Sequence, residues 1–420
     1  MTDHDVLVVG GGLAGRIAAL SAADAGASVH LVSGAEDTSR QSAGLVNLLG
    51  YLADADAPVS DPLDRLADVP PAHPYRRLGV DAVRSAVEFA ADELGDAIVG
   101  LDDPRNALLP TELGVPAPSF GHPPTMTAGR LSRGDPMLLV DVDPLPDFDA
   151  AMAAHRLDGA VPFDVAAATI DLGDRLPPDA DRQFLAKRID ETPGTSHETA
   201  IVDDVADAID RVDVDPARVG LPAVLGIERV SEVHERLSDR LGVPVFEIPT
   251  APPSVSGVRF DARLDDALAS RPVARTEGVD VVETAVHDGR VESVAIDRFG
   301  DEEWVSADRV VLATGGFVGG GLVGDRAGVR EPLFDVPVEA PADRTEWTAE
   351  RPFEGQPFAR FGLATDESLR PLVDGDPVAE TLFAAGDVLG GFDGVRERSG
   401  GGVAIATGYA AGRLAAGVSP

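Results

Sequence analysis

The segment DVLVVGGGLAG at residues 5–15 decides the fold of this chain. It begins with an apolar run, residues 5–9, of the kind that forms a strand buried on both faces of a parallel sheet. Three glycines in G-x-G-x-x-G spacing follow, and the alanine-rich residues 16–25 have the composition of a helix. A second apolar run at residues 28–32 completes a βαβ unit with its glycines at the first strand-to-helix turn.

Gly10, Gly12 and Gly15 each have a physical reason to be glycine in such a unit. The first permits the tight turn, the second lets a phosphate approach the backbone, and the third lets helix and strand pack closely. The helix N-terminus then offers free N–H groups and a partial positive charge to an anion. The pattern predicts that these three glycines bind the phosphate of a dinucleotide or flavin; the alternative is a glycine-rich turn that serves packing alone.

The acidic residue that usually follows the second strand and binds a ribose hydroxyl is missing. Ser33 and Gly34 stand at that place, and Glu36 and Asp37 come a few residues later. A flavin mononucleotide (FMN), a shifted dinucleotide, or a Glu36 that bends back to the ribose would each explain the difference.

Two further apolar runs, residues 309–313 and 381–385, also end at glycines and predict strands of the same sheet. The first leads into Thr314 and Gly315. In flavoproteins of the two-dinucleotide type, a strand ending in A-T-G returns the chain to the cofactor, where only glycine leaves room. We therefore expect Thr314 and Gly315 to contact the cofactor.

Gly386 and Asp387 end the last of these runs, and Gly401 and Gly402 open a predicted helix over residues 401–415. An aspartate at this position of such proteins binds the ribityl or phosphate part of a flavin. The helix start directs its dipole at the end of the flavin where negative charge grows on reduction. The three glycine motifs in this order predict a flavin protein.

Composition excludes several classes of function. The chain has 420 residues, 72 of them acidic and 35 basic, with a formal net charge of −37. Nucleic acids and anionic membrane surfaces would repel it. Hydrophobic residues make up 44%, enough for a sizeable core. Lys187 is the only lysine, and this acid-rich, lysine-poor composition predicts a protein that works in concentrated salt, where screening makes the self-repulsion tolerable; an ordinary acidic cytosolic enzyme is the alternative.

The chain contains no cysteine. Disulfides and thiolate-bound iron–sulfur or zinc sites are therefore excluded, and we predict no metal site. The N-terminus has no signal-peptide pattern, and no uncharged stretch has the length of a spanning helix. We expect a cytoplasmic protein.

The predicted fold class is α/β: a Rossmann-like FAD/NAD(P)-binding fold with a split parallel sheet, a β-meander and a large inserted α/β or α+β domain. Residues 1–52 and 250–420 are assigned to a discontinuous flavin-binding domain, and residues 53–249 to an inserted substrate or partner domain. The predicted helices cover residues 82–94, 148–157, 231–241 and 260–269. The remaining predicted strands cover residues 137–142, 219–225, 243–248, 280–286, 290–296 and 303–305.

Several segments outside the glycine motifs resemble the B subunit of the anaerobic glycerol-3-phosphate dehydrogenases. They are residues 71–75 (PAHPY), 249–255 (PTAPPSV), 320–323 (GGLV), 328–332 (GVREP), 365–371 (TDESLRP) and 388–393 (VLGGFD). The resemblance runs nearly end to end and departs at about residues 104–216.

This resemblance implies a flavin subunit, with FMN as the expected cofactor and FAD as the alternative. Such a subunit works beside a catalytic FAD subunit and a membrane-associated iron–sulfur subunit, which would hold it at the inner face of the cell membrane. Together they oxidise sn-glycerol 3-phosphate to dihydroxyacetone phosphate and pass electrons to quinone. Two other interpretations stay open: an architectural subunit without flavin, and a flavin dehydrogenase acting alone on another hydroxy acid or alkene.

Four polar or small residues are further candidates. His73, in a proline-flanked loop, is a candidate base or phosphate ligand, although a histidine in that setting is more often a structural hydrogen-bonder. Arg330 is a candidate for binding an anionic substrate, with a salt bridge to Glu331 as the alternative. Ser42 and Gly44 resemble the stretch that lines the flavin edge in related oxidoreductases.

Overall fold

The computed structural model divides the chain into two compact units. The first comprises residues 1–39, 47–95 and 264–420, and the second residues 40–46 and 96–263. The described residues are 4–34, 42–53, 55, 57–172, 176–177, 179–191, 196–213, 215–298, 300–317, 319–351 and 355–420. Both units are discontinuous in sequence. Residues 53–95, assigned above to the inserted domain, fall in the first unit, and residues 40–46 and 250–263, assigned to the flavin-binding domain, fall in the second.

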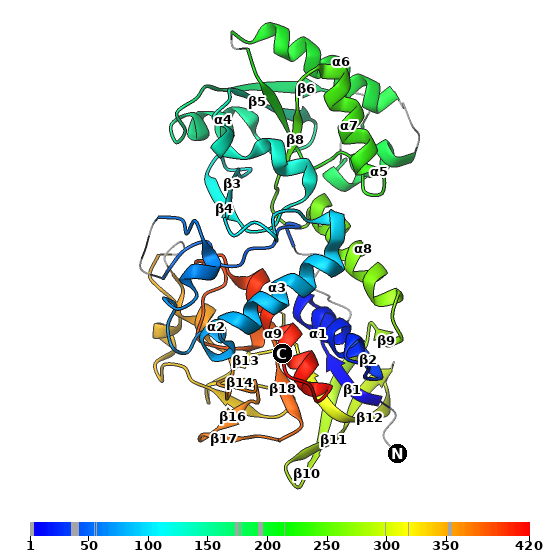
Figure 1. Cartoon of the computed structure of the whole chain (residues 1–420), viewed down its shortest axis with the longest axis vertical. Coiled ribbons are helices and arrows are strands. Elements are labelled where there is room, and N and C mark those ends of the chain that lie inside the picture. The colour runs from blue at the N-terminus through cyan, green and yellow to red at the C-terminus, as the bar shows by residue number, and fades with distance from the viewer. Residues whose placement is uncertain are drawn as a thin grey trace. The chain divides into compact units, whose positions relative to one another are not determined.

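A seven-stranded sheet forms the centre of the first unit (Figure 1). Its parallel part has the order β18-β12-β1-β2-β9, and β10 and β11 continue it as an antiparallel meander next to β12. The strands are β1 (His4–Val9), β2 (Val29–Ser33), β9 (Val273–Glu277), β10 (Asp280–His287), β11 (Arg290–Arg298), β12 (Asp301–Leu312) and β18 (Leu382–Ala384). The predicted βαβ unit, split sheet and meander are all present.

The strand β12 differs from the prediction, because two short strands were expected over the residues that it covers. Its first half pairs antiparallel with β11, and its second half pairs parallel with β1 and β18. No glycine or proline interrupts residues 301–312, and Ala307 at the crossover is buried. One strand therefore serves both parts of the sheet.

Two helices of the first unit, α1 (Leu13–Asp24) and α9 (Gly400–Ala415), lie against each other (Figure 1). A Cβ at Gly408 would come within 2.4 Å of the Ala14 carbonyl oxygen, and one at Gly412 within 2.3 Å of the Ala18 carbonyl oxygen. The glycines of α9 thus permit the two helix backbones to approach closely.

Residues 47–95 join the first unit because α3 (Val80–Leu94) packs on α9. The short helix α2 (Pro74–Leu78) precedes α3. The remaining strands of this unit are β13 (Val323–Gly324), β14 (Val329–Glu331), β15 (Val336–Val338), β16 (Leu372–Val373) and β17 (Asp376–Pro377).

The second unit contains a four-stranded, fully parallel sheet with the order β6-β5-β7-β8, so it is α/β rather than α+β. Its elements are β5 (Met137–Asp143), α4 (Ala150–Asp158), β6 (Val165–Asp171), α5 (Arg182–Glu191), α6 (Ser196–Arg211), β7 (Arg218–Pro222), α7 (Val230–Leu241) and β8 (Val245–Ile248). The hairpin of β3 (Ala107–Pro110) and β4 (Pro116–Ser119) precedes them, and α8 (Val255–Ala269) follows and continues into the first unit. Sequence patterns did not predict β6, α5 or α6.

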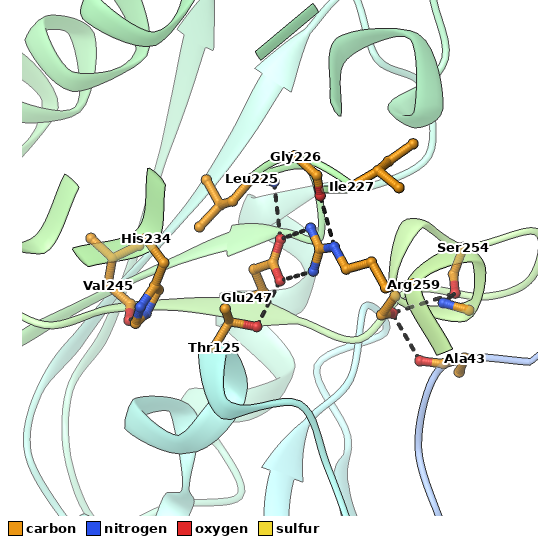
Figure 2. Close-up of polar contacts among 12 residues, drawn as sticks. Ala43, Thr125, Leu225, Gly226, Ile227, His234, Val245, Glu247, Ser254 and Arg259 are labelled. Atoms are coloured by element: carbon orange, nitrogen blue, oxygen red, sulfur yellow. Dashed lines mark hydrogen bonds and ion pairs between the residues drawn. The ribbon is translucent and has the colours of Figure 1, made fainter. Parts of the chain in front are cut away.

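A buried ion pair lies at the end of β8. The Glu247 carboxylate is fully buried and accepts hydrogen bonds from both terminal nitrogens of Arg259, at 2.5 and 2.9 Å. It also accepts from the Thr125 hydroxyl at 2.7 Å and the Leu225 N–H at 3.0 Å (Figure 2). Arg259 Nε donates to the Gly226 carbonyl at 2.7 Å. All of these groups are satisfied within the unit.

Among the described residues, no helix combines the length and apolarity needed to cross a membrane.

Candidate cofactor site

Three glycine turns meet at the carboxyl ends of β1, β12 and β18. A Cβ at Gly10 would lie 2.1 Å from the Ala313 carbonyl oxygen, so the first turn touches the end of β12. A Cβ at Gly386 would lie 2.7 Å from Ala14 Cβ, and one at Gly316 would lie 3.1 Å from the Asp387 carbonyl oxygen. The motifs that the sequence separates by hundreds of residues are therefore neighbours in the first unit.

The turn before α1 has the geometry that the glycine spacing predicts. Gly10 has a φ of +117°, and a Cβ at Gly15 would lie 1.9 Å from the Gly10 carbonyl oxygen. Gly12 caps α1 with no side-chain hydrogen bond, so the first turn of this helix keeps N–H groups for an anion. The buried Arg16, which sequence reasoning missed, donates from Nε to the Gly11 carbonyl at 2.7 Å and thereby holds the turn.

The second turn contains a buried polar atom without a partner. The Thr314 hydroxyl oxygen is buried and has no hydrogen-bond partner among the described residues. Gly315 has a φ of +82°, and its carbonyl oxygen would lie 1.9 Å from a Cβ at Gly321. Because buried hydroxyls are normally hydrogen-bonded, Thr314 is suited to bind a group that completes the site.

The third turn is fastened to α9. The Gly386 N–H donates to the hydroxyl of the buried Thr407 at 2.9 Å, and that hydroxyl donates to the Val403 carbonyl at 2.6 Å. The Asp387 side chain reaches solvent, yet desolvation by the surrounding protein raises the pKa of its carboxyl. A cofactor hydroxyl that donated to this carboxylate would offset that cost.

The start of α9 is held by a buried chain of hydrogen bonds. His73 Nε2 lies 3.2 Å from a Glu397 carboxylate oxygen, which also accepts from the Ser399 hydroxyl at 3.2 Å. Gly401 is partly buried in the first turn of the helix. Gly402 has no room for a side chain, since a Cβ there would lie 2.3 Å from the Tyr75 hydroxyl.

His73 is placed where a structural residue is expected. Its ring is fully buried, and its Nδ1 accepts from the Tyr75 N–H at 3.1 Å, which caps α2. Both ring nitrogens are thus engaged, so neither faces a substrate in this conformation. A catalytic role for His73 stays a prediction, and these contacts favour a role in positioning α9.

Arg330 lies on β14, away from the glycine turns in sequence and partly exposed. It forms ion pairs with Asp335 at 3.0 Å and Asp325 at 3.6 Å, and not with Glu331. Glu331 is instead buried and accepts from the Leu333 and Phe334 N–H groups. Anion binding by Arg330 stays a prediction.

Ser42 and Gly44 lie in the second unit, packed on the start of α8. The Ser42 carbonyl accepts from the Ser254 hydroxyl at 2.9 Å, and a Cβ at Gly44, whose φ is +70°, would lie 2.5 Å from the Ser256 carbonyl oxygen. Their predicted place at the flavin edge is not tested by these contacts within one unit.

Two charged residues near the glycine turns escaped sequence reasoning. Arg398 directly precedes the α9 start, has a φ of +49°, and pairs with no carboxylate among the described residues; desolvation lowers the pKa of its guanidinium. Asp280, the first residue of β10, places a carboxylate oxygen 3.1 Å from where a Cβ of Gly34 would lie. A carboxylate therefore does stand beside the end of β2, supplied by a distant part of the chain; Glu36 and Asp37 lie outside the described residues.

Comparisons with known proteins agree with this site. The FAD binding domain family matches residues 5–403, so fold and site together define a protein of the FAD-binding-domain class. The B subunit of the probable anaerobic glycerol-3-phosphate dehydrogenase of Halobacterium salinarum is 43% identical over 99% of this chain and 98% of its own. The corresponding B subunit of Pectobacterium atrosepticum is 30% identical over 96% of each chain. The chain belongs to the family of anaerobic glycerol-3-phosphate dehydrogenase B subunits.

Solved structures that resemble the chain include 3-ketosteroid delta1-dehydrogenase from Sterolibacterium denitrificans, at 13% identity and a TM-score of 0.43 over 99% of both chains. The FrdA chain of E. coli quinol fumarate reductase is 12% identical, with a TM-score of 0.42 over 99% of this chain and 70% of its own.

The residues of the first unit fit the flavin that the family implies. In the first turn, Gly10 and Gly15 let the backbone pack closely, since a Cβ would lie 2.1 Å from the Ala313 carbonyl oxygen and 1.9 Å from the Gly10 carbonyl oxygen, and no side chain caps the start of α1. The Thr314 hydroxyl is a buried group that lacks a partner among the described residues, and the surrounding protein raises the pKa of the Asp387 carboxyl, which still reaches solvent. Backbone N–H groups, a hydroxyl and a carboxyl group thus lie on the three turns.

Proposed function

We propose that this chain is the flavin-bearing redox subunit of a quinone-linked glycerol-3-phosphate dehydrogenase. In that complex it works beside a catalytic FAD subunit and a membrane-associated iron–sulfur subunit, in the oxidation of sn-glycerol 3-phosphate to dihydroxyacetone phosphate. The observation that carries the proposal is the convergence of the three glycine turns around a Thr314 hydroxyl that no described residue satisfies. An architectural subunit would have no need to keep that hydroxyl buried and free.

Different turns and side chains would bind different parts of the flavin. Gly10, Gly12 and the first turn of α1 would hold the phosphate through backbone N–H groups. Thr314 and Asp387 would bind hydroxyls of the ribityl chain. The start of α9, at Gly401 and Gly402, would stabilise negative charge at one end of the ring system through the helix dipole. A bound flavin supplies the ability to take up two electrons and release them one at a time.

Asp280 bears on the choice between FMN and FAD. FMN is expected from the family resemblance and from the lack of an acid after β2, and the Asp280 carboxylate beside Gly34 offers a substitute for that acid. We therefore propose FAD, with Asp280 accepting a hydrogen bond from the adenosine ribose. Asp280→Asn should weaken FAD binding by about tenfold and leave FMN binding unchanged, since one charge-assisted hydrogen bond is lost.

Glu277→Gln is the matched control, because Glu277 lies at the end of the neighbouring strand β9 but pairs with Arg275. Equal affinities of the wild type and the Asp280 variant for FAD would remove the ribose role. A wild-type preference for FMN would restore the first expectation.

The lack of cysteine supports the partner assignment. A chain without thiolates cannot hold an iron–sulfur cluster of the usual kind, so electrons bound for quinone must leave through another subunit. We infer that this chain reaches the membrane only through that subunit, at its cytoplasmic face.

The deciding experiment is the visible spectrum of the chain purified in molar salt, followed by identification of the released cofactor. Flavin absorption near 450 nm with about one flavin per chain is expected. A chain that stays colourless after incubation with FMN and with FAD would support the architectural interpretation. Fractionation of membranes with and without the iron–sulfur subunit tests the partner role, and binding of the lone chain to bare lipid would contradict it.

A further inference from the structure

Two nitrogen groups in the second unit are buried without a partner among the described residues, at either side of the 3₁₀ turn Pro124–Gly129. His122 is fully buried, and its Nδ1 is one of these groups. Arg130 is half-buried, and its Nε is the other. Both residues belong to the second unit, outside the glycine turns.

The charge of Arg130 is the second feature of this segment, in a chain with 72 acidic and 35 basic residues. Among the described residues no carboxylate forms an ion pair with Arg130, whereas Arg133, one turn later, pairs with Asp135 at 3.4 Å. Because buried donors are normally satisfied, the free Nε of Arg130 indicates an acceptor that the described part of the chain does not provide.

A second arginine builds the support for this segment. Arg218 is fully buried, and its guanidinium donates to the carbonyls of Ala128 and Arg130, at 2.8 and 2.7 Å, and of Asp135, at 3.0 Å. These bonds fix the backbone from which the Arg130 side chain extends. These bonds go to neutral carbonyls. Burial lowers the pKa of the Arg218 guanidinium to about 10, and the nearby Asp135 carboxylate partly offsets that effect.

The Nδ1 atom of His122 can donate a hydrogen bond to an anion. Burial, together with the nearby charge of Arg130, lowers the pKa of its imidazole to about 4, so the ring is neutral at pH 7. Its Nε2 lies 3.4 Å from the Thr127 hydroxyl oxygen, and a hydroxyl that donates to Nε2 leaves the proton on Nδ1. Gly100 borders this nitrogen without a side chain, since a Cβ there would lie 3.7 Å from Nδ1.

We propose that His122 and Arg130 form a binding site for the phosphate group of a small phosphorylated ligand. Arg130 supplies a planar set of N–H donors suited to phosphate oxygens, and His122 adds one N–H donor. The anion site rests on these contacts alone. Its assignment to glycerol 3-phosphate rests in addition on the proposed function.

Binding of sn-glycerol 3-phosphate and of inorganic phosphate to the full chain, at constant chloride concentration, tests the site by calorimetry. Arg130→Gln should weaken binding of both probes by about tenfold or more, as expected for the loss of a charged donor. Arg130→Lys keeps the charge without the planar donors and should give an intermediate loss. Arg133→Gln is the matched control and should change binding by less than about twofold.

The results separate this site from the flavin. Binding of glycerol 3-phosphate but not of free phosphate would still support it if Arg130→Gln abolished that binding. A folded wild-type chain that binds neither probe, or an Arg130→Gln chain that binds as the wild type does, would overturn it. Flavin absorption near 450 nm is measured on the same samples: a flavin-loaded chain without phosphate binding contradicts this site alone, and a colourless chain that binds phosphate contradicts the flavin proposal alone.

Discussion

The backbone N–H groups beside two helix starts are bonded differently in the two units of this protein. In the first unit, Gly12 caps α1 without a side-chain hydrogen bond. In the second unit, the Asp190 carboxylate accepts from the N–H groups of Ile227, Glu228 and Arg229, at 2.6–3.1 Å, just before α7. In the second unit a carboxylate of the chain itself thus accepts from the N–H groups of the loop that leads into α7, whereas no side chain caps α1 in the first unit.

Two carboxyl groups, one in each unit, also differ in how the surrounding protein changes their pKa. Burial raises the pKa of Glu247, but the Arg259 guanidinium and the hydrogen bonds around it outweigh that effect and hold its pKa below the usual range (Figure 2). Desolvation raises the pKa of Asp387 in the first unit. A carboxylate paired by its own chain stabilises a fold, and an unpaired one beside glycine turns is suited to an external ligand.

The largest expected effect comes from adding a side chain at the start of α1. Gly12→Val should abolish flavin binding while the chain stays folded, because the new side chain would occupy the space of the phosphate. Absorbance near 450 nm and circular dichroism measure the two properties. Gly159→Val is the control, as Gly159 is exposed and has no atom closer than 3.6 Å to a Cβ. Full flavin occupancy in a folded Gly12→Val chain would show that this turn does not bind the phosphate.

Removing the internal partner of the second unit should cost stability. Glu247→Gln leaves Arg259 buried without its counter-charge and should lower the free energy of unfolding by about 3–5 kcal/mol, measured by denaturant titration in molar salt. Because the folded pKa of Glu247 is lowered, the stabilisation it provides is present above the ordinary glutamate range and is lost as the pH falls through the folded pKa.

The acid-induced loss should therefore be smaller in Glu247→Gln than in the wild type. Glu232→Gln, which breaks the exposed pair with Arg229, should change stability little. Equal effects of the two substitutions would show that burial does not matter at Glu247.

A smaller effect is expected from Asp190. Asp190→Ala leaves three N–H groups of the loop before α7 without their acceptor and should destabilise the chain by about 1–2 kcal/mol, the usual cost of unsatisfied donors. Asp207→Ala, an exposed acid on α6, removes the same charge and should change stability by less than about 0.5 kcal/mol. If both variants unfold at the same denaturant concentration, the Asp190 carboxylate does not stabilise this loop.

The smallest effect should have the opposite sign. Asp387→Asn should raise the melting temperature of the flavin-free chain at pH 7, by about 2 °C or less, while it weakens flavin binding. The folded pKa of Asp387 is raised, so the charged form costs stability at neutral pH, and the gain should vanish below the ordinary aspartate range, where both states are protonated. A lower melting temperature at pH 7 would mean that Asp387 is paired in the free chain.

Local residue patterns were enough to predict the βαβ unit, the three glycine motifs, the split sheet and the family. A turn with positive φ at Gly10 and a close contact at Gly15 each require glycine, and that requirement is visible in the spacing. The apolar run at residues 5–9 likewise predicts a strand, and the small residues at 401–415 predict a helix that packs closely on its neighbour.

Only the folded chain shows which side chains and strands lie next to each other. The sequence makes His73 a candidate base, and the structure places it beside Glu397, 324 residues away. A carboxylate oxygen of Asp280 lies beside Gly34 at the end of β2, and the two strands predicted at residues 303–305 and 309–313 correspond to one strand, β12. Burial, ion pairing and strand pairing depend on residues distant in sequence, and a pattern along the chain contains no information on those distances.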